Sequence, residues 1–128
     1  MPKVHQEIHF NAPPAKIYRA LMDSAEHAKF TSAAASIGSE PGSAWSAHDG
    51  KISGRQVELI DGTRIVQTWR AGNWPEGTHS IVRFELSKDG DGTKVVLDHD
   101  AVTEEQVPHL ESGWTKMYWD PLRKHLEG

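Results

Sequence analysis

The chain has 128 residues, with 14 Lys and Arg against 18 Asp and Glu, a formal net charge of −4 and no cysteine. A chain of this length buries roughly two thirds of its unfolded surface without disulfides or structural metals, and the lack of cysteine excludes a small disulfide-held secreted protein. The slightly acidic balance argues against nucleic-acid binding. No apolar run is long enough for a signal peptide or a membrane span. We therefore expect one cytoplasmic domain over residues 1–128.

The first third of the chain predicts one strand and two short helices. Residues 4–10 alternate, with Val4, Ile8 and Phe10 on one face together with Gln6, as in a half-buried strand. Two prolines end this strand, and proline suits the first turn of a helix. Apolar residues at helical spacing predict helices over residues 15–22 and 24–30. Residues 31–41 show no periodicity, which indicates a connection or a short edge strand.

The middle of the chain predicts an antiparallel meander. Strand-like runs cover residues 43–48, 51–60, 63–70, 78–87 and 93–101. Asp-Gly pairs at residues 49–50 and 61–62, and a Gly-rich turn at 88–92, separate them; Asp and Gly tolerate the positive φ angles of tight hairpin turns. Residues 71–77 form a longer loop.

A long amphipathic helix is predicted over residues 104–128. Pro121 lies inside it, so we expect a kink there or a restart capped by Asp120. This helix is the element long enough to cover the apolar face of the meander. The fold class is then α+β: a curved antiparallel sheet wrapped around the C-terminal helix, enclosing a tapering cavity. The apolar face of the helix is expected to hold Leu110, Trp114, Met117, Tyr118, Leu122 and Leu126.

Three segments together resemble a known family: RIVQTWR at residues 64–70, WPEGTH at residues 74–79, and Gly113-Trp114 with Tyr118-Trp119. The combination is similar to the family of the activator of heat-shock protein 90 ATPase, in its C-terminal domain and its stand-alone bacterial homologues. The resemblance implies a helix-grip fold, shared with START lipid-transfer domains, pollen allergens and polyketide cyclases in the SRPBCC superfamily. The eukaryotic activator also has an N-terminal domain that docks on the chaperone, whereas we expect all 128 residues to form one domain.

The strand and helix patterns predict which side chains point into the molecule. Gln67 and Trp69 share a strand face, Phe84 lies on the next strand, and Trp114, Met117 and Tyr118 face them from the helix. These aromatic residues either line a ligand cavity or fill the core. The amide of Gln67 needs an internal partner, which is either a ligand or a buried water or backbone group.

His99 is the inward polar residue of the last strand. Its neighbours Asp98 and Asp100 point to the opposite face, so the three do not form a catalytic triad. His99 either makes a polar or weak acid–base contact with a ligand or is a structural histidine. No set of catalytic residues emerges, so the sequence favours a binding protein over an enzyme of cyclase or dehydratase type, and we expect no cofactor.

The remaining sequence features concern metal binding, the long loop, Gly113 and the expected partner. Eight histidines without cysteine or an HExxH motif do not predict a metal site. Trp74 and Pro75, in the long loop, suit a lid over the cavity or an anchor for a partner. Gly113 is expected to let the helix approach the sheet closely. The expected partner is an apolar or amphipathic small molecule; the alternative is a chaperone in a stress-related interaction, and the chain is a monomer or a homodimer.

Overall fold

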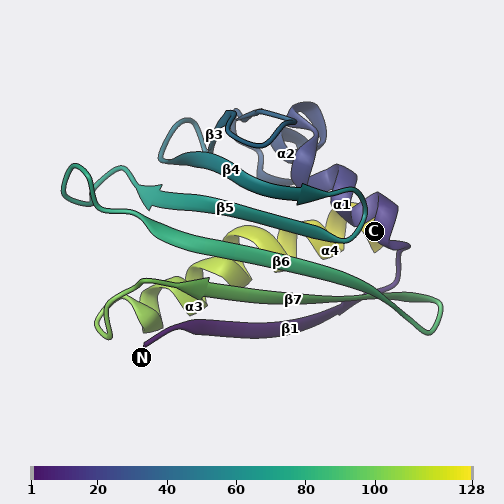
Figure 1. Cartoon of the computed structure of the whole chain (residues 1–128). Helices are drawn as coiled ribbons and strands as arrows, with labels where there is room; N and C mark the ends of the chain where they lie inside the picture. The colour runs from purple at the N-terminus through teal and green to yellow at the C-terminus, as the bar shows by residue number, and fades with distance from the viewer. Residues whose placement is uncertain (1, 128) are drawn as a thin grey trace.

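One antiparallel sheet of seven strands, in the order β1-β7-β6-β5-β4-β3-β2, forms the frame of the molecule (Figure 1). The computed structural model describes residues 2–127. Each strand from β2 to β7 pairs with the next one along the chain, and β1 adds to the far side of β7. The strands are β1 (Val4–Phe10), β2 (Ser36–Ile37), β3 (Ala44–Ala47), β4 (Ile52–Ile60), β5 (Arg64–Ala71), β6 (Ser80–Asp89) and β7 (Gly92–Asp100).

Helices cover one face of this sheet. The two short helices α1 (Pro14–Met22) and α2 (Ser24–Thr31) follow β1, with Pro14 in the first turn of α1. The C-terminal helix consists of α3 (Val107–Trp114), a π-helical segment (Thr115–Trp119) and α4 (Asp120–Glu127). It passes behind the strands in Figure 1. The predicted helix-grip architecture is confirmed.

The inward rows of the central strands build the core. Ile65 of β5 lies opposite Phe84 of β6, which lies opposite Leu97 of β7, and all three are buried. The Phe84 ring packs edge-on against Trp114 and Trp119 of the C-terminal helix, with centroids 5.5 and 6.1 Å away. The predicted strand faces are therefore the ones that the helix covers.

The C-terminal helix is irregular just before Pro121, where the sequence predicted a kink or a restart capped by Asp120; Asp120 itself has helical backbone angles, so the chain does not leave the helix there. In the π segment the backbone N–H of Asp120 bonds to the carbonyl of Thr115, five residues back. The wider turn returns Trp119 to the face of Trp114, and the two indoles stack at 5.8 Å and 20°. Met117 is correspondingly turned away from the core and is 51% exposed, so its expected place on the buried face is wrong.

The cause of this irregularity lies close to Pro121. A proline cannot donate to the carbonyl four residues back, and its ring crowds that carbonyl. The wider turn immediately before Pro121 accommodates both effects. The helix also begins at Val107 instead of residue 104, after a turn in which Thr103 and Gln106 each accept the other's backbone N–H through their side chains.

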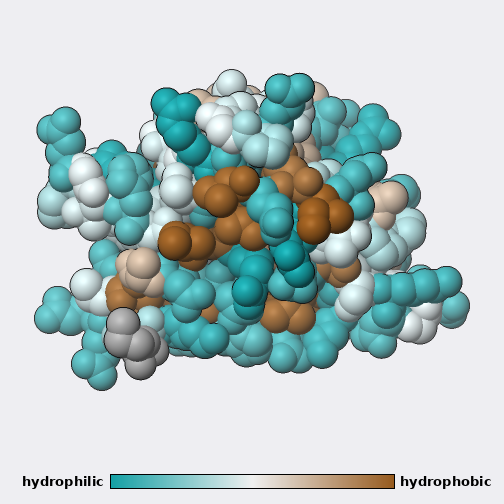
Figure 2. Space-filling model, in the orientation of Figure 1, coloured by the Kyte–Doolittle hydropathy of each residue, from teal (hydrophilic) through white to brown (hydrophobic). Residues whose placement is uncertain are grey.

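The outer face of the sheet carries ion pairs that link neighbouring strands. Asp98 pairs with Arg83 at 2.9 Å and with His5 at 2.7 Å, and Arg64 pairs with Glu85 at 3.6 Å. Burial favours a higher pKa for Asp98, but hydrogen bonds from its basic neighbours outweigh it and lower that pKa to about 2. Figure 2 shows this face as mostly hydrophilic, with an apolar patch near its middle.

Candidate functional site

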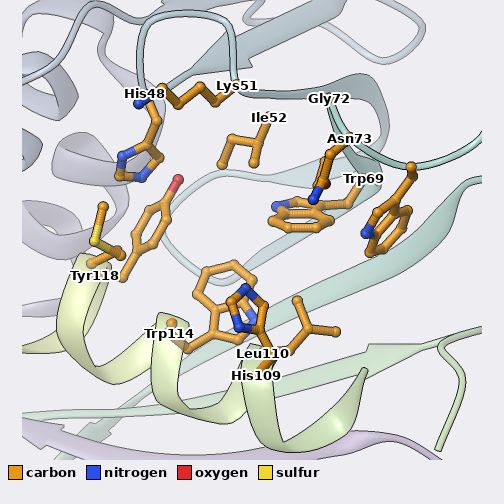
Figure 3. A pocket seen from close by; sticks show the side chains of 14 residues that line it. His48, Lys51, Ile52, Trp69, Gly72, Asn73, His109, Leu110, Trp114 and Tyr118 are labelled. Carbon is orange, nitrogen blue, oxygen red and sulfur yellow. The ribbon is translucent and has the colours of Figure 1, made fainter. Parts of the chain in front are cut away.

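A pocket of about 480 Å³ opens between the C-terminal helix, the β3–β4 turn and the β5–β6 loop (Figure 3). This volume is typical of sites for small organic molecules. Aromatic and aliphatic side chains make up most of its wall. The lining residues are His48, Lys51, Ile52, Trp69, Ala71, Gly72, Asn73, Trp74, His109, Leu110, Gly113, Trp114, Met117 and Tyr118.

The structure brings together some of the residues predicted for the cavity and separates others. Those that line the pocket are Trp69, Trp114, Met117 and Tyr118, and Trp74, expected in a lid or a partner-binding loop, lines it as well. Gln67, Phe84 and His99 are buried beside it without lining it. Pro75 is exposed next to Trp74. The predicted tryptophans, Tyr118 and Met117 thus surround the pocket, whereas Phe84 and the two polar residues lie in the core.

His99 is held in a chain of hydrogen bonds that fixes its protonation. The indole N–H of Trp114 donates to His99 Nδ1 at 3.1 Å, so Nδ1 accepts and Nε2 carries the proton. Nε2 then donates to Ser80 Oγ at 2.7 Å, and Ser80 donates to the Trp69 carbonyl at 3.0 Å. Burial lowers the pKa of His99 to about 4. Both ring nitrogens are occupied, which is the arrangement of a structural histidine.

The side-chain amide of Gln67 is hydrogen-bonded to a residue of the neighbouring strand β4. The amide donates to Gln56 Oε1 at 3.0 Å, and Gln56 donates in turn to the Gly38 carbonyl at 3.1 Å. Gln56 points inward at a β-bulge, where the register of β4 against β5 shifts between Gln56 and Glu58. The partner is a side chain, neither the water nor the backbone group considered from the sequence.

One wall of the pocket is a pair of indole rings. Trp74, in the β5–β6 loop, packs edge-on against Trp69 with centroids 5.4 Å apart. The Arg70 guanidinium donates to the carbonyls of Trp74 at 2.7 Å and Pro75 at 3.3 Å, which ties this loop to β5. The indole N–H of Trp69 is buried without a hydrogen-bond partner. Burying such a group without a partner costs free energy, because its hydrogen bond to water is lost.

The opposite end of the pocket is polar. The Tyr118 hydroxyl lies 3.0 Å from His27 Nε2, and the ring of His48 packs edge-on against Tyr118 with centroids 5.2 Å apart. His48 is buried, and its Nε2 has no partner. Burial lowers the pKa of both histidines, that of His27 to about 4, and raises the pKa of Tyr118. All three side chains are therefore uncharged near neutral pH.

Sequence patterns did not identify His48 as a pocket residue. It has φ 51°, Asp49 and Gly50 after it also have positive φ, and its side chain is buried in the pocket lining. The available signal was the Asp-Gly turn itself, because residues beside a tight turn often adopt unusual backbone angles. Lys51 and Asn73 were missed because they lie in a turn and a loop, where periodicity carries no information. His109 was missed although it lies in the C-terminal helix, one turn before Gly113, because a polar residue is not counted among the apolar positions of the helix.

Gly113 has a different role from the one expected. A side chain added there would meet nothing within 4 Å, so this glycine does not mediate a close approach of helix and sheet. Gly113 lines the pocket instead, and the absence of a side chain leaves the space open.

Residues 2–127 offer neither a metal-binding cluster nor a membrane-spanning helix. No group of three or more His, Asp or Glu side chains gathers there in a way that could hold a metal ion. Within the same range, no helix combines the length and the apolar character needed to cross a membrane.

Curated proteins of known name are similar to this chain in sequence. Curated relatives include the "Activator of 90 kDa heat shock protein ATPase homolog 2" of Mus musculus, 29% identical over 77% of this chain, and the "Activator of 90 kDa heat shock protein ATPase homolog" of Dictyostelium discoideum, 29% identical over 89%. The matched region spans about 30% of the length of each of these two relatives.

Solved structures show the same fold. An HSP90 activator from Plasmodium falciparum superposes with a TM-score of 0.85 at 21% identity, covering 95% of this chain and 94% of that one. The Aha1 dimer from Colwellia psychrerythraea gives 0.83 at 24% identity, with coverage of 99% and 97%. The family model of the "Activator of Hsp90 ATPase homolog 1-like protein" matches residues 11–127, and the chain belongs to this family.

Proposed function

We propose that this protein binds a small apolar or amphipathic molecule in the pocket between the C-terminal helix and the sheet. The observation that carries the proposal is the pocket itself, a space of about 480 Å³ walled by three tryptophans and a tyrosine. Aromatic side chains offer a large apolar contact area at low conformational cost.

The polar atoms around the pocket favour binding over catalysis. His99, the candidate base, uses both ring nitrogens in hydrogen bonds and does not line the pocket. The Tyr118 hydroxyl is paired with His27. The unpaired indole N–H of Trp69 remains, and a ligand acceptor that reaches it would recover a desolvation cost of about 1–3 kcal/mol.

Native mass spectrometry of protein purified from its own host tests the proposal directly. A bound small molecule that is released on denaturation is the expected result. A library of apolar and amphipathic compounds, followed through tryptophan fluorescence and melting temperature, gives a second measurement because three tryptophans line the pocket. If neither measurement detects a ligand, the proposal fails.

A pocket-filling variant makes the test specific to this site. Gly113→Leu places a side chain in the open space of the pocket and should abolish ligand binding. Ser112→Leu is the matched control, because Ser112 is the exposed neighbour on the same helix and does not line the pocket. Equal binding by both variants would place the ligand elsewhere.

A protein-interaction role is the second candidate, and the names of the curated relatives favour it. The matched region is about 30% of those relatives, so an activating role for this chain is itself a proposal. Co-precipitation with heat-shock protein 90 from the same organism and a raised ATPase rate are the expected results. No co-precipitation and an unchanged ATPase rate would exclude this role.

A further inference from the structure

We infer that the ligand of this pocket is an anionic amphiphile, an apolar body that ends in a carboxylate, with the carboxylate directed toward the β3–β4 turn. This inference rests on the proposed binding function and specifies the chemistry of the ligand. It is carried by the charge pattern of the lining and by two buried polar atoms that lack partners.

The charge pattern of the lining differs from that of the whole chain. The chain is acidic, with 18 carboxylate side chains against 14 Lys and Arg. Among the described residues that line the pocket there is no Asp or Glu, whereas Lys51, His48 and His109 are present. Lys51 is exposed at the mouth and forms no ion pair with any residue in the described part of the chain. A ligand carboxylate would therefore meet the Lys51 ammonium and no carboxylate among the lining side chains. Asp49, the carboxylate of the same turn, does not line the pocket and accepts the backbone N–H of Ala34 at 2.7 Å.

Two buried polar atoms in the pocket lining also favour a ligand with acceptor atoms. Trp69 is 7% exposed and His48 8%, and the Nε atoms of both rings lack partners. Tryptophan Nε1 is a donor only, so its ligand partner must be an acceptor. In Figure 3 the nitrogen edge of Trp69 faces the side of the pocket where His48 and Tyr118 lie. A carboxylate has about four acceptor sites, enough for several donors at once.

The other head groups fit less well. A cationic head would approach Lys51 with no acidic residue among the lining side chains to balance the two charges. A neutral polar head could satisfy Trp69 but would leave Lys51 unused. Hydrogen bonds that involve an ionised group are about twice as strong as neutral ones, so a carboxylate gains most from the donors present. The apolar body then packs against Trp114, Met117 and Leu110.

Matched pairs of ligands test the charge alone. Isothermal titration at pH 7.5 compares 2-naphthoate with 2-naphthamide and decanoate with decanamide, since each amide keeps the shape and the acceptor but not the charge. We expect each carboxylate to bind about fivefold more tightly than its amide. Equal affinities, or tighter binding of the amides, would overturn the inference while leaving the proposed function intact. If neither body binds in either form while the native mass spectrum shows a bound molecule, the inference fails and the proposed function stands. If the native mass spectrum and the compound library also detect no ligand, both fail.

Variants then locate the charge. Lys51→Met should weaken carboxylate binding about fivefold and leave amide binding unchanged, and Lys51→Arg should restore it. Lys88→Met is the control, because it removes the same charge from an exposed strand position outside the pocket. A loss in Lys88→Met as large as in Lys51→Met would indicate a general charge effect and would refute a carboxylate site at the β3–β4 turn.

Discussion

Acidification is expected to destabilise the fold through its buried histidines. His27 and His99 have pKa values of about 4 in the folded chain, against an ordinary value of 6.5. The native state therefore binds fewer protons than the unfolded state, and the free energy of unfolding falls as the pH drops from about 6.5 toward 4. For each histidine the loss between pH 7.5 and pH 5.0 is about 2 kcal/mol.

Other ionisable groups also change the free energy of unfolding as the pH falls, each in a direction that its pKa shift gives. The lowered pKa of His48 adds to the loss, whereas the raised pKa of the exposed His5 opposes it. The pKa of Asp98, about 2, keeps the stabilising contribution of this carboxylate in place until the pH falls below about 4. The total change is a sum, so a variant is needed to isolate one histidine.

His99→Gln supplies that variant. A glutamine at this position can still accept from Trp114 and donate to Ser80, but it does not titrate. Urea unfolding followed by far-ultraviolet circular dichroism, at pH 7.5 and pH 5.0, should show a pH-dependent loss about 2 kcal/mol smaller than in the parent chain. His79→Gln, at an exposed position, should leave the loss unchanged. If His99→Gln keeps the full loss, burial does not lower the pKa of His99 as described.

Three other changes have defined outcomes in urea or thermal unfolding. Gly113→Ala should raise the free energy of unfolding by about 0.5–1 kcal/mol, because helical glycine is costly and the added carbon meets open space; a loss would refute that geometry. Gln56→Leu and Gln67→Leu should each cost about 1–3 kcal/mol, and the double variant should cost less than their sum; strict additivity would contradict the pairing. Deleting the exposed Lys116 should convert the π segment to α-helix with little loss of melting temperature, whereas deleting Glu111 in α3 should lower it strongly; equal effects would argue against a π segment.

The strands were predictable because their side chains alternate with a period of exactly two. Once the turns were located, the inward positions of Trp69, Phe84 and His99 followed from counting, and all three are buried. The order of strands needed only the meander rule, because consecutive strands pair here from β2 to β7. The alternation of side chains and the turn residues are local properties, so both can be read from the sequence alone.

The parts that were missed depend on contacts between distant residues. The wider turn before Pro121 carries Trp119 to a buried position, where its indole donates to Gln6 Oε1 on β1 at 2.7 Å, 113 residues away. The pairing of Gln67 with Gln56 depends on a bulge that no period of two contains. His48 enters the pocket through a turn whose backbone angles are set by Asp49, which accepts the backbone N–H of Ala34 at 2.7 Å.

Buried polar groups next to the pocket differ in whether they bond to protein atoms, and His27 Nδ1 and Arg70 Nε show that unpaired buried atoms also occur outside its lining. The amide of Gln67 and both ring nitrogens of His99 bond to protein atoms, and neither side chain lines the pocket. Trp69 Nε1 and His48 Nε2 are equally buried, lack partners, and belong to side chains that do line it. An unpaired buried group costs free energy in the empty protein that a fitting ligand can return on binding. The affinity of this pocket should therefore depend on the acceptor that a ligand presents to Trp69 as well as on the apolar area that it buries.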